Sequence, residues 1–389
     1  MLQLLYKQAM NRKSFIRNTG LITAGLSLAE LHSLASVAAP LKNSLPRWKG
    51  FNLLDFFSPD KLATSLSSKE EHFKWMRDWG FDFVRIPIAY PCYLDIDRTK
   101  NITPDDVYKI STRAVDTIDS LVAMAHRHNL HVSLNLHRAP GYCVNAGFYE
   151  PYNLWTDEAA QKAFDFHWNM WAKKYKNVSP AKISFDLLNE PSMRADMNDQ
   201  HSQRSAVPGD VYRKVAKGAA EAIRKENPKH LVIADGNDTG TKVIPELIDL
   251  NIAQSCRGYN PGTISHYKAP WANKDTANMP APKWPGQVGD KYLSKAMLEA
   301  FYQPWKDLVQ KGVGVHCGEC GSWNKTPHDV FLAWFTDVLD ILTSAGIGFA
   351  VWNFIGDFGV LDSRRADVVY EDWYGHQLDQ KFLDLMRKQ

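Results

Sequence analysis

Residues Ile183-Ser-Phe-Asp-Leu-Leu-Asn-Glu-Pro191 form a short, largely apolar stretch that ends in an amide, a carboxylate and a proline. Its length and composition predict a buried strand over 183–188, and Pro191 ends this strand because proline donates no ladder hydrogen bond. Similar segments predict seven further strands, at 48–53, 83–88, 131–136, 231–234, 257–266, 313–316 and 348–353.

Amphipathic segments separate these strands. The segment 103–128 opens with Thr103-Pro104-Asp105-Asp106, where proline suits the first helical turn and the acids suit the positive end of the helix dipole. Further helices are expected at 156–175, 208–226, 291–311, 326–345 and 377–388. Strands that alternate with helices pair in parallel, and eight of them close a (β/α)8 barrel, the TIM-barrel fold.

A doubly wound open sheet is the alternative α/β architecture. It usually carries a glycine-rich phosphate turn after its first strand, and Gly50-Phe51-Asn52 is not such a turn. The chain has 389 residues and no internal repeat, linker or charge block after residue 41, so a single barrel domain is expected over 45–389.

Composition limits the partners of this domain. Hydrophobic residues make up 44% and charged residues 23%, as in ordinary globular proteins. The net charge of +3, without a long basic run, gives no reason to expect nucleic acid or an anionic membrane as a partner. The chain has five cysteines, which are too few for a disulfide-scaffolded fold, and their odd number would leave one unpaired. We expect a monomer.

The first 39 residues differ from the rest. A basic segment, Asn11-Arg-Lys-Ser-Phe-Ile-Arg17, precedes an apolar stretch that ends in Ser36-Val-Ala-Ala-Pro40, an order typical of a signal peptide. The Arg-Lys pair resembles a twin-arginine signal with lysine at its second position. Glu30 and His32 interrupt the stretch and disfavour a membrane span. We expect export to the periplasm or medium; a retained helix or an uncleaved anchor is the alternative.

Polar side chains recur at the carboxyl ends of the expected strands, where the loops of a barrel build its active site. Glu190 follows the fourth strand, and Glu319 follows the seventh between Gly318 and Gly321. Either glutamate alone could be a surface carboxylate at a strand exit. Together they suit the hydrolysis of a glycosidic bond, which needs one protonated and one ionised carboxyl group. Other strand ends carry Asn52, Arg85, His137, Asn189, His266, Tyr267 and Trp352.

These motifs resemble the cellulase family, glycoside hydrolase family 5. The resemblance rests on Asn189-Glu190-Pro191 and Gly318-Glu319, with Arg85 in Val-Arg-Ile-Pro and His137 in Leu-Asn-Leu-His, all in the family's order. It extends from Gly50-Phe51-Asn52 to Trp352-Asn353. It implies a barrel enzyme that hydrolyses β-linked glycans with retention of configuration, without a cofactor or metal.

The resemblance also implies roles for the residues around the reacting bond. Glu190 would be the acid/base and Glu319 the nucleophile. Asn189 would hydrogen-bond the 2-hydroxyl of the sugar at the cleavage point, an interaction that strengthens in the transition state. Arg85 and Tyr267 would hold Glu319 ionised and oriented, because a nearby cation lowers the pKa of a carboxyl group.

The remaining expected site residues are rings. His137 would contact the sugar at the cleavage point, Trp352 would stack under it, and His266 would lie near the acid/base. Trp271 and Trp323 are expected to line further sugar subsites because they follow reactive strand ends closely. The proline-rich segment 270–289 predicts a long ordered loop over the barrel mouth.

Two features depart from the family pattern. Tyr267 directly follows His266, whereas the family more often has His-x-Tyr on its sixth strand, and a step of one residue turns a strand side chain to the opposite face. Cys317 and Cys320 flank Glu319. Strand alternation places Cys317 on the inward face with Glu319 and Cys320 on the other, which disfavours a disulfide between them.

The leading functional prediction is an endo-β-1,4-glucanase acting on an oligo- or polysaccharide. A β-mannanase, or another β-glucan or β-glucoside hydrolase, stays open because loops decide the sugar. A metal-dependent sugar isomerase or epimerase is a further alternative, but Arg85 and Asn189 suit a sugar better than a cation. A non-catalytic carbohydrate-binding barrel, or a redox or metal-centre protein using Cys317-Gly-Glu-Cys320, would leave the two glutamates unexplained.

Overall fold

The computed structural model describes residues 44–147 and 150–389. The predicted export signal at 1–39 lies outside these residues. In the described part of the chain, no helix is both long enough and apolar enough to cross a membrane.

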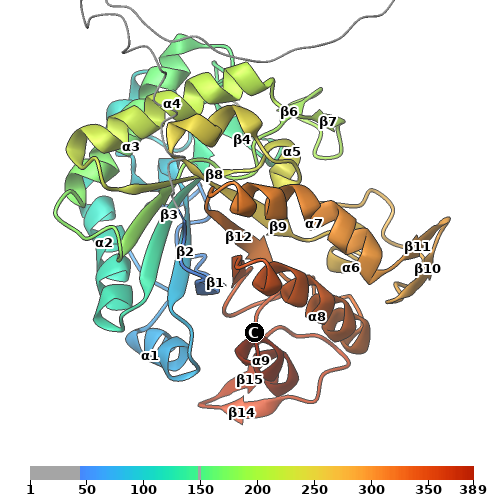
Figure 1. Ribbon diagram of the computed structural model, residues 1–389. Coiled ribbons are helices and arrows are strands. Elements are labelled where there is room, and N and C mark those ends of the chain that lie inside the picture. The colour runs from blue at the N-terminus through green and yellow to red at the C-terminus, as the bar shows by residue number, and fades with distance from the viewer. Residues whose placement is uncertain (1–43, 148–149) are drawn as a thin grey trace, which may run out of the picture. The chain divides into compact units, whose positions relative to one another are not determined.

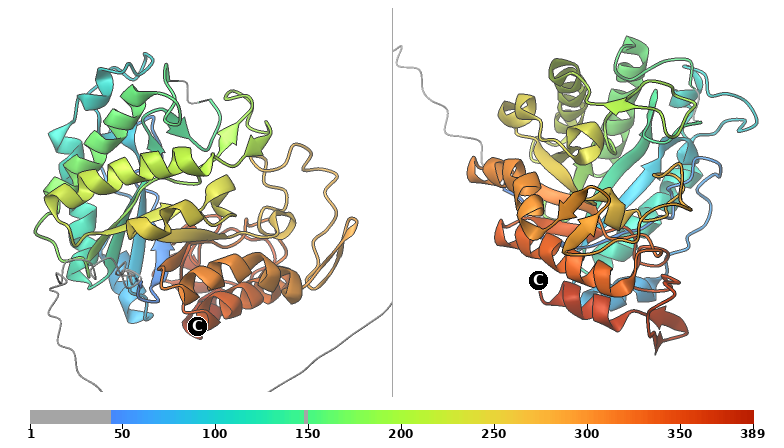
Figure 2. Two further views of the ribbon diagram at one scale, coloured as in Figure 1. Left: turned by 45° about the horizontal axis from the view of Figure 1, so that its top comes forward. Right: turned by 90° about the vertical axis from the view of Figure 1, so that its right-hand side faces the viewer.

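Eight parallel strands close into a barrel, with helices around its outside (Figures 1 and 2). The first and last strands of the circle pair with Lys49 opposite Phe349, so the sheet has no open edge between them. The TIM-barrel prediction is therefore confirmed, and the open-sheet alternative is wrong. In spatial order the strands are β1 (Lys49–Asn52), β2 (Phe83–Ala89), β3 (His131–Ala139), β5 (Ile183–Asp186), β8 (Leu231–Asp235), β9 (Ala253–Gly258), β12 (Val315–Cys320) and β13 (Gly348–Val351).

The helices bury apolar faces against these strands. In α2, the buried residues recur every three or four positions, from Ala114 to Ala125, which gives one continuous apolar stripe. The longer helices are α1 (Glu70–Asp78), α2 (Thr112–Arg127), α3 (Glu158–Lys174), α4 (Gly209–Glu226), α7 (Lys295–Gln310), α8 (His328–Ser344) and α9 (Gln380–Arg387).

The expected helix at 103–128 begins later than predicted, at Thr112. Thr103 and Asp106 bond each other's backbone N–H groups through their side chains, at 3.0 and 3.3 Å, and so stabilise a local turn instead of a helix. Ser111 then caps α2 by accepting a hydrogen bond from the N–H of Ala114.

The sixth strand is the largest departure from the prediction of 257–266. β9 ends at Gly258, and Pro261 leads into the single helical turn α6 (Gly262–Ser265). The carbonyl of Pro261 accepts from the N–H of Ser265, and proline itself offers no donor to extend the ladder. His266 therefore follows a helical turn and does not stand at a strand end.

The barrel interior changes character along its axis. Rings fill its amino-terminal end, where His131 stacks on Trp48 with 3.8 Å between centroids and Phe83 lies 4.5 Å from His316. Burial lowers the pKa of His131 to about 3, so this layer is uncharged near neutrality. Further along the strands the interior holds charged groups, beginning with Arg85 on β2. Because these rings fill the amino-terminal end of the barrel, the mouth of the barrel lies at the carboxyl-terminal end of the strands.

Candidate active site

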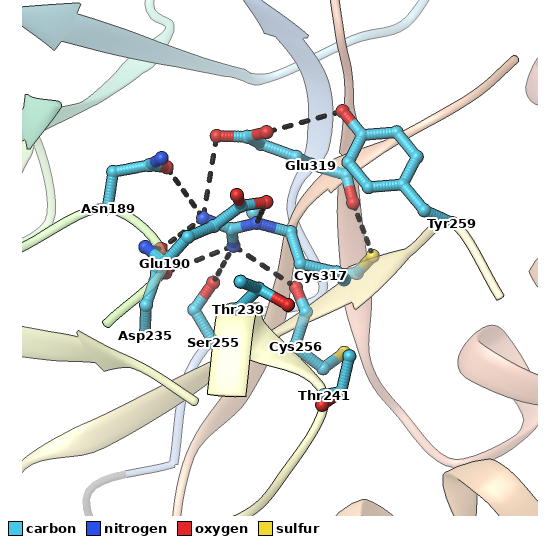
Figure 3. Close-up of polar contacts among 12 residues, drawn as sticks. Asn189, Glu190, Asp235, Thr239, Thr241, Ser255, Cys256, Tyr259, Cys317 and Glu319 are labelled. Atoms are coloured by element: carbon cyan, nitrogen blue, oxygen red, sulfur yellow. Dashed lines mark hydrogen bonds and ion pairs between the residues drawn. The ribbon is translucent and has the colours of Figure 1, made fainter. Parts of the chain in front are cut away.

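A cavity of about 1050 Å³ opens at the carboxyl ends of the strands and contains both glutamates. Glu319 lies on β12, and Glu190 follows β5 in the loop that leaves the barrel. Figure 3 shows their side chains converging with Asn189 and Asp235 around a shared set of polar contacts.

Three donors surround the buried carboxylate of Glu319. Arg85 donates from Nη1 to Oε1 at 2.6 Å, and Arg257 donates from Nη2 to the same oxygen at 3.4 Å. The hydroxyl of Tyr259 donates to Oε2 at 3.2 Å. Burying a carboxylate is costly unless it is paired and hydrogen-bonded, and these contacts stabilise the ionised form.

A β-bulge aims Glu319 into the barrel. The register of β12 against β9 shifts between Cys317 and Glu319, and a Cβ added to Gly318 would lie 2.6 Å from the hydroxyl of Ser255. Gly318 therefore faces the interior beside Glu319, because the extra residue breaks the alternation of the strand.

The bulge makes the alternation-based prediction for Cys317 wrong. Arg257 points inward on β9, so its neighbour Gly258 faces outward, and a Cβ added to Gly258 would lie 3.1 Å from Sγ of Cys317. Cys317 thus faces the helices, away from Glu319. All five cysteines are buried free thiols.

Glu190 has a different environment. Its backbone is in the left-handed region, at φ 49°, and is held there because its N–H donates to Asp235 at 2.9 Å and its carbonyl accepts from Tyr142 at 2.5 Å. Burial, followed by the negative charge of Glu319, raises the pKa of Glu190 to about 7, against the opposing charge of Arg257. Glu190 therefore keeps its proton to a higher pH than an ordinary glutamic acid does.

Two arginines organise the floor of the cavity. Arg85 donates to Asp186 at 2.7 Å, and Arg257 donates from both terminal nitrogens to Asp235. Both guanidinium groups also donate to Oδ1 of Asn189, at 3.1 and 2.8 Å. Because that oxygen is fully engaged, the amide NH2 of Asn189, which also lies 3.4 Å from Nε2 of His137, is the donor at the cavity wall.

Stacked rings form one wall of the cavity. His137 lies on Trp352 with 5.4 Å between centroids, and Phe57 contacts both rings edge-on. Burial, together with the charge of Arg85, lowers the pKa of His137 well below its ordinary value, so the imidazole is neutral. Flat apolar faces of this kind suit the C–H faces of a sugar.

A second aromatic group, Trp271, Trp323, His266 and Phe358, lines another part of the cavity. Trp271 meets Trp323 at 4.6 Å between centroids, and Phe358 lies within 6.4 Å of both. Burial lowers the pKa of His266 to about 4. The cavity that holds the two glutamates is thus lined by two aromatic groups from different segments of the chain.

The structure brings nearly all of the predicted site residues to this cavity. Arg85 lies beneath it and reaches it through Glu319. The residues that line it directly are His137, Asn189, Glu190, His266, Trp271, Glu319, Trp323 and Trp352.

The prediction for Tyr267 is wrong. Tyr267 is absent from the cavity wall, its ring lies 5.3 Å from Nζ of Lys268, and Tyr259 makes the bond to Glu319 instead. The error follows from placing the end of the sixth strand at His266. Arg257-Gly258-Tyr259 stands at the true strand end and has the family's spacing, with arginine in place of histidine.

Sequence reasoning also missed Asp186 and Asp235, the last residues of β5 and β8. The signal was present, since a carboxylate at the end of an apolar strand needs a buried partner. In the described residues, no three His, Cys, Asp or Glu side chains are arranged to hold a metal ion.

Comparisons with known proteins show the family of this chain. The family model described as Cellulase (glycosyl hydrolase family 5) matches residues 40–357. Endoglucanase C of Acetivibrio thermocellus is 26% identical over 340 residues, which cover 81% of this chain and 92% of that protein. Cellodextrinase A of Ruminococcus flavefaciens is 25% identical over 304 residues, covering 77% and 83%. The solved structure of a glycoside hydrolase is 34% identical, with a TM-score of 0.78 and coverage of 88% and 99%.

Proposed function

Because this chain belongs to the cellulase family, glycosyl hydrolase family 5, we propose that it is a retaining endo-β-1,4-glucanase with Glu190 as acid/base and Glu319 as nucleophile. Membership of this family makes the chain a β-glycoside hydrolase with a saccharide substrate. This assignment replaces the isomerase, binding-protein and redox alternatives. The observation that carries the assignment of roles is the contrast between the surroundings of the two carboxyl groups: Glu319 accepts hydrogen bonds from three donors, and Glu190 has a pKa raised to about 7.

The reaction takes two steps. An oxygen of Glu319 attacks the anomeric carbon, the bond to the leaving oxygen breaks, and the proton of Glu190 passes to that oxygen. Water then attacks the same carbon and gives its proton to Glu190, and the bond to Glu319 breaks. Each step inverts the anomeric carbon, so the two steps together retain its configuration, and both carboxyl groups return to their starting states.

The neighbouring groups bind the sugar at the cleavage point. The amide NH2 of Asn189 donates to its 2-hydroxyl, because the amide oxygen is already taken by Arg85 and Arg257. His137 and Trp352 offer a stacked, uncharged surface to its apolar face. These contacts orient the anomeric carbon toward Glu319.

Endo action on a polymer is supported by the shape of the cavity. Its volume of about 1050 Å³ and its two aromatic groups, in one cavity with both glutamates, suit a substrate longer than a single sugar. The relatives named endoglucanase and cellodextrinase favour β-1,4-glucan over mannan or xylan. Export suits such a substrate, because a polysaccharide does not enter the cell. We propose that the segment with Arg12-Lys13 is the export signal.

A substrate panel tests this proposal. Purified protein without residues 1–39 is incubated with soluble cellulose derivatives, mixed-linkage β-glucan, β-mannan and xylan. We expect highest kcat/KM on β-1,4-glucan, with viscosity falling faster than reducing ends appear. Preference for mannan would replace the substrate assignment, and release of single terminal sugars would contradict endo action.

A further inference from the structure

Arg257 contacts both catalytic carboxyl groups at once. Its Nε lies 3.2 Å from Oε1 of Glu190, and its Nη2 lies 3.4 Å from Oε1 of Glu319. Arg85 pairs with Glu319 but has no ion pair with Glu190. Within residues 44–147 and 150–389, Arg257 is the cation that joins the two glutamates.

The guanidinium of Arg257 is fixed in this position. Asp235 accepts from both of its terminal nitrogens, and the hydroxyl of Ser255 accepts from Nη1 at 3.1 Å. Gly240 packs against the arginine stem so closely that an added Cβ would lie 2.5 Å from Cγ. Arg257 is therefore a preorganised charge whose position does not depend on substrate.

The double displacement moves a negative charge between these glutamates. The proposed mechanism starts with Glu319 ionised and Glu190 protonated. When the glycosyl-enzyme forms, Glu319 becomes a neutral ester, and Glu190, having given its proton to the leaving oxygen, becomes the anion. Hydrolysis of the ester returns the charge to Glu319.

We propose that Arg257 is a positioning residue that serves as the shared counter-ion of this exchange: it pairs with Glu319 in the free enzyme and with Glu190 in the glycosyl-enzyme. This inference rests on the proposed two-step function. In the free enzyme the charge of Glu319 offsets Arg257 and lets Glu190 keep its proton. Once the ester forms, that offset disappears, and Arg257 holds Glu190 ionised and ready to accept the proton of water.

Other charged and titratable groups also face Glu190. Their influence on its ionisation is the same in the free enzyme and in the glycosyl-enzyme, so the exchange of charge adds to it. They come from β8, β9, β12 and the loops around the mouth. Asp235 and Glu319 favour its protonated form, whereas Arg257 and Arg204 favour its ionised form. Further titratable neighbours in the cavity or against its wall are Tyr142, His137, Tyr259 and His266.

The inference is tested in the hydrolysis of the ester alone. 2,4-Dinitrophenyl β-cellobioside has a leaving group that needs no proton, so its kcat reports deglycosylation, and the acid limb of kcat against pH reports ionisation of Glu190 in the glycosyl-enzyme. In Arg257→Gln we expect this limb to move up by about one pH unit, which is a roughly tenfold loss of kcat on the acid side. Arg257→Lys keeps the charge, and should move the limb by less than half as much.

Control measurements separate structure from charge. Arg213→Gln removes a partly exposed arginine that pairs with Asp249, outside the cavity, and should leave the limb in place. Thermal unfolding of each variant reports folding. A uniform fall in kcat with an unmoved limb, or equal shifts in the lysine and glutamine variants, would overturn the role as counter-ion. Absence of any burst or turnover in the wild type would instead refute the proposed function.

Discussion

At the scale of single residues, the site separates two identical side chains by their surroundings. Glu319 has two guanidinium groups and a phenol as donors. Glu190 has one guanidinium contact, at 3.2 Å, and the negative charge of Glu319 raises its pKa. The difference in surroundings, and with it the proposed difference in role, comes from neighbours on other strands. The sequence around each glutamate could therefore suggest a pair but not assign the protonation states.

Tyr259 and Tyr267 form a matched pair of test sites. Tyr259→Phe removes a donor to the Glu319 carboxylate, and a hydrogen bond to a charged group is worth about 1.5–3 kcal/mol, so kcat/KM should fall at least tenfold. Tyr267→Phe should stay within about twofold of the wild type on the same substrate. Equal losses in the two variants would show that the donor to Glu319 has been misassigned.

Glu190 should impose a pH limit on substrates with poor leaving groups. Its raised pKa, about 7, keeps the proton below that pH, and the proton is lost as the pH rises through it. The kcat/KM for cello-oligosaccharides should therefore fall above about pH 7. In Glu190→Gln this hydrolysis should be nearly abolished while cleavage of 2,4-dinitrophenyl β-cellobioside in the first turnover persists. Loss of both would contradict an acid role.

At the scale of elements, the bulge in β12 and the short β9 decide which side chains reach the mouth. Periodicity predicted the eight barrel strands and most of the long helices, but not α1. β9 ends at Gly258, before the predicted boundary, and the tyrosine that bonds Glu319 is therefore Tyr259 and not Tyr267. Because of the bulge at Gly318, the side chain of Cys317 points out of the barrel and not, as was expected, into it. Both features depend on contacts between neighbouring strands, so a single-strand pattern could not reveal them.

Gly318→Ala tests the bulge. The added Cβ would lie 2.6 Å from the Ser255 hydroxyl and 3.3 Å from Nη1 of Arg257, so it must shift the groups that hold Glu319. We expect kcat to fall more than tenfold while the protein stays folded by circular dichroism. Gly218→Ala, where the new methyl meets only the Asp165 carboxylate, is the control and should keep its kcat. Full activity in Gly318→Ala would show that the bulge does not position Glu319.

At the scale of the whole molecule, the barrel gathers residues that are far apart in the chain. Arg85 and Glu319 are separated by 234 positions, yet they come within 2.6 Å because all eight strands point the same way and end at one mouth. This regularity is why the set of site residues could be predicted without their contacts. The substrate-determining loops follow no such rule, and so the sugar remained open at the level of sequence.

The aromatic group around Trp271 should matter only for long substrates. Trp271 lies beside Trp323, on a different part of the cavity from His137 and Trp352. Trp271→Ala should raise KM for cellohexaose about tenfold, in line with a stacking contact of about 1.5 kcal/mol, and leave KM for 2,4-dinitrophenyl β-cellobioside within about twofold. An equal rise for both substrates would place Trp271 at the cleavage-point sugar instead.

The central claim is that Glu319 forms a covalent bond to the sugar, and trapping that bond tests it most directly. The enzyme is treated with 2,4-dinitrophenyl 2-deoxy-2-fluoro-β-cellobioside, which slows hydrolysis of the ester, then digested and analysed by mass spectrometry. We predict one added fluorocellobiosyl group on the peptide that contains Cys317-Gly-Glu319-Cys320. A label on any other carboxylate, or full turnover of natural substrate by Glu319→Ala, would contradict the account.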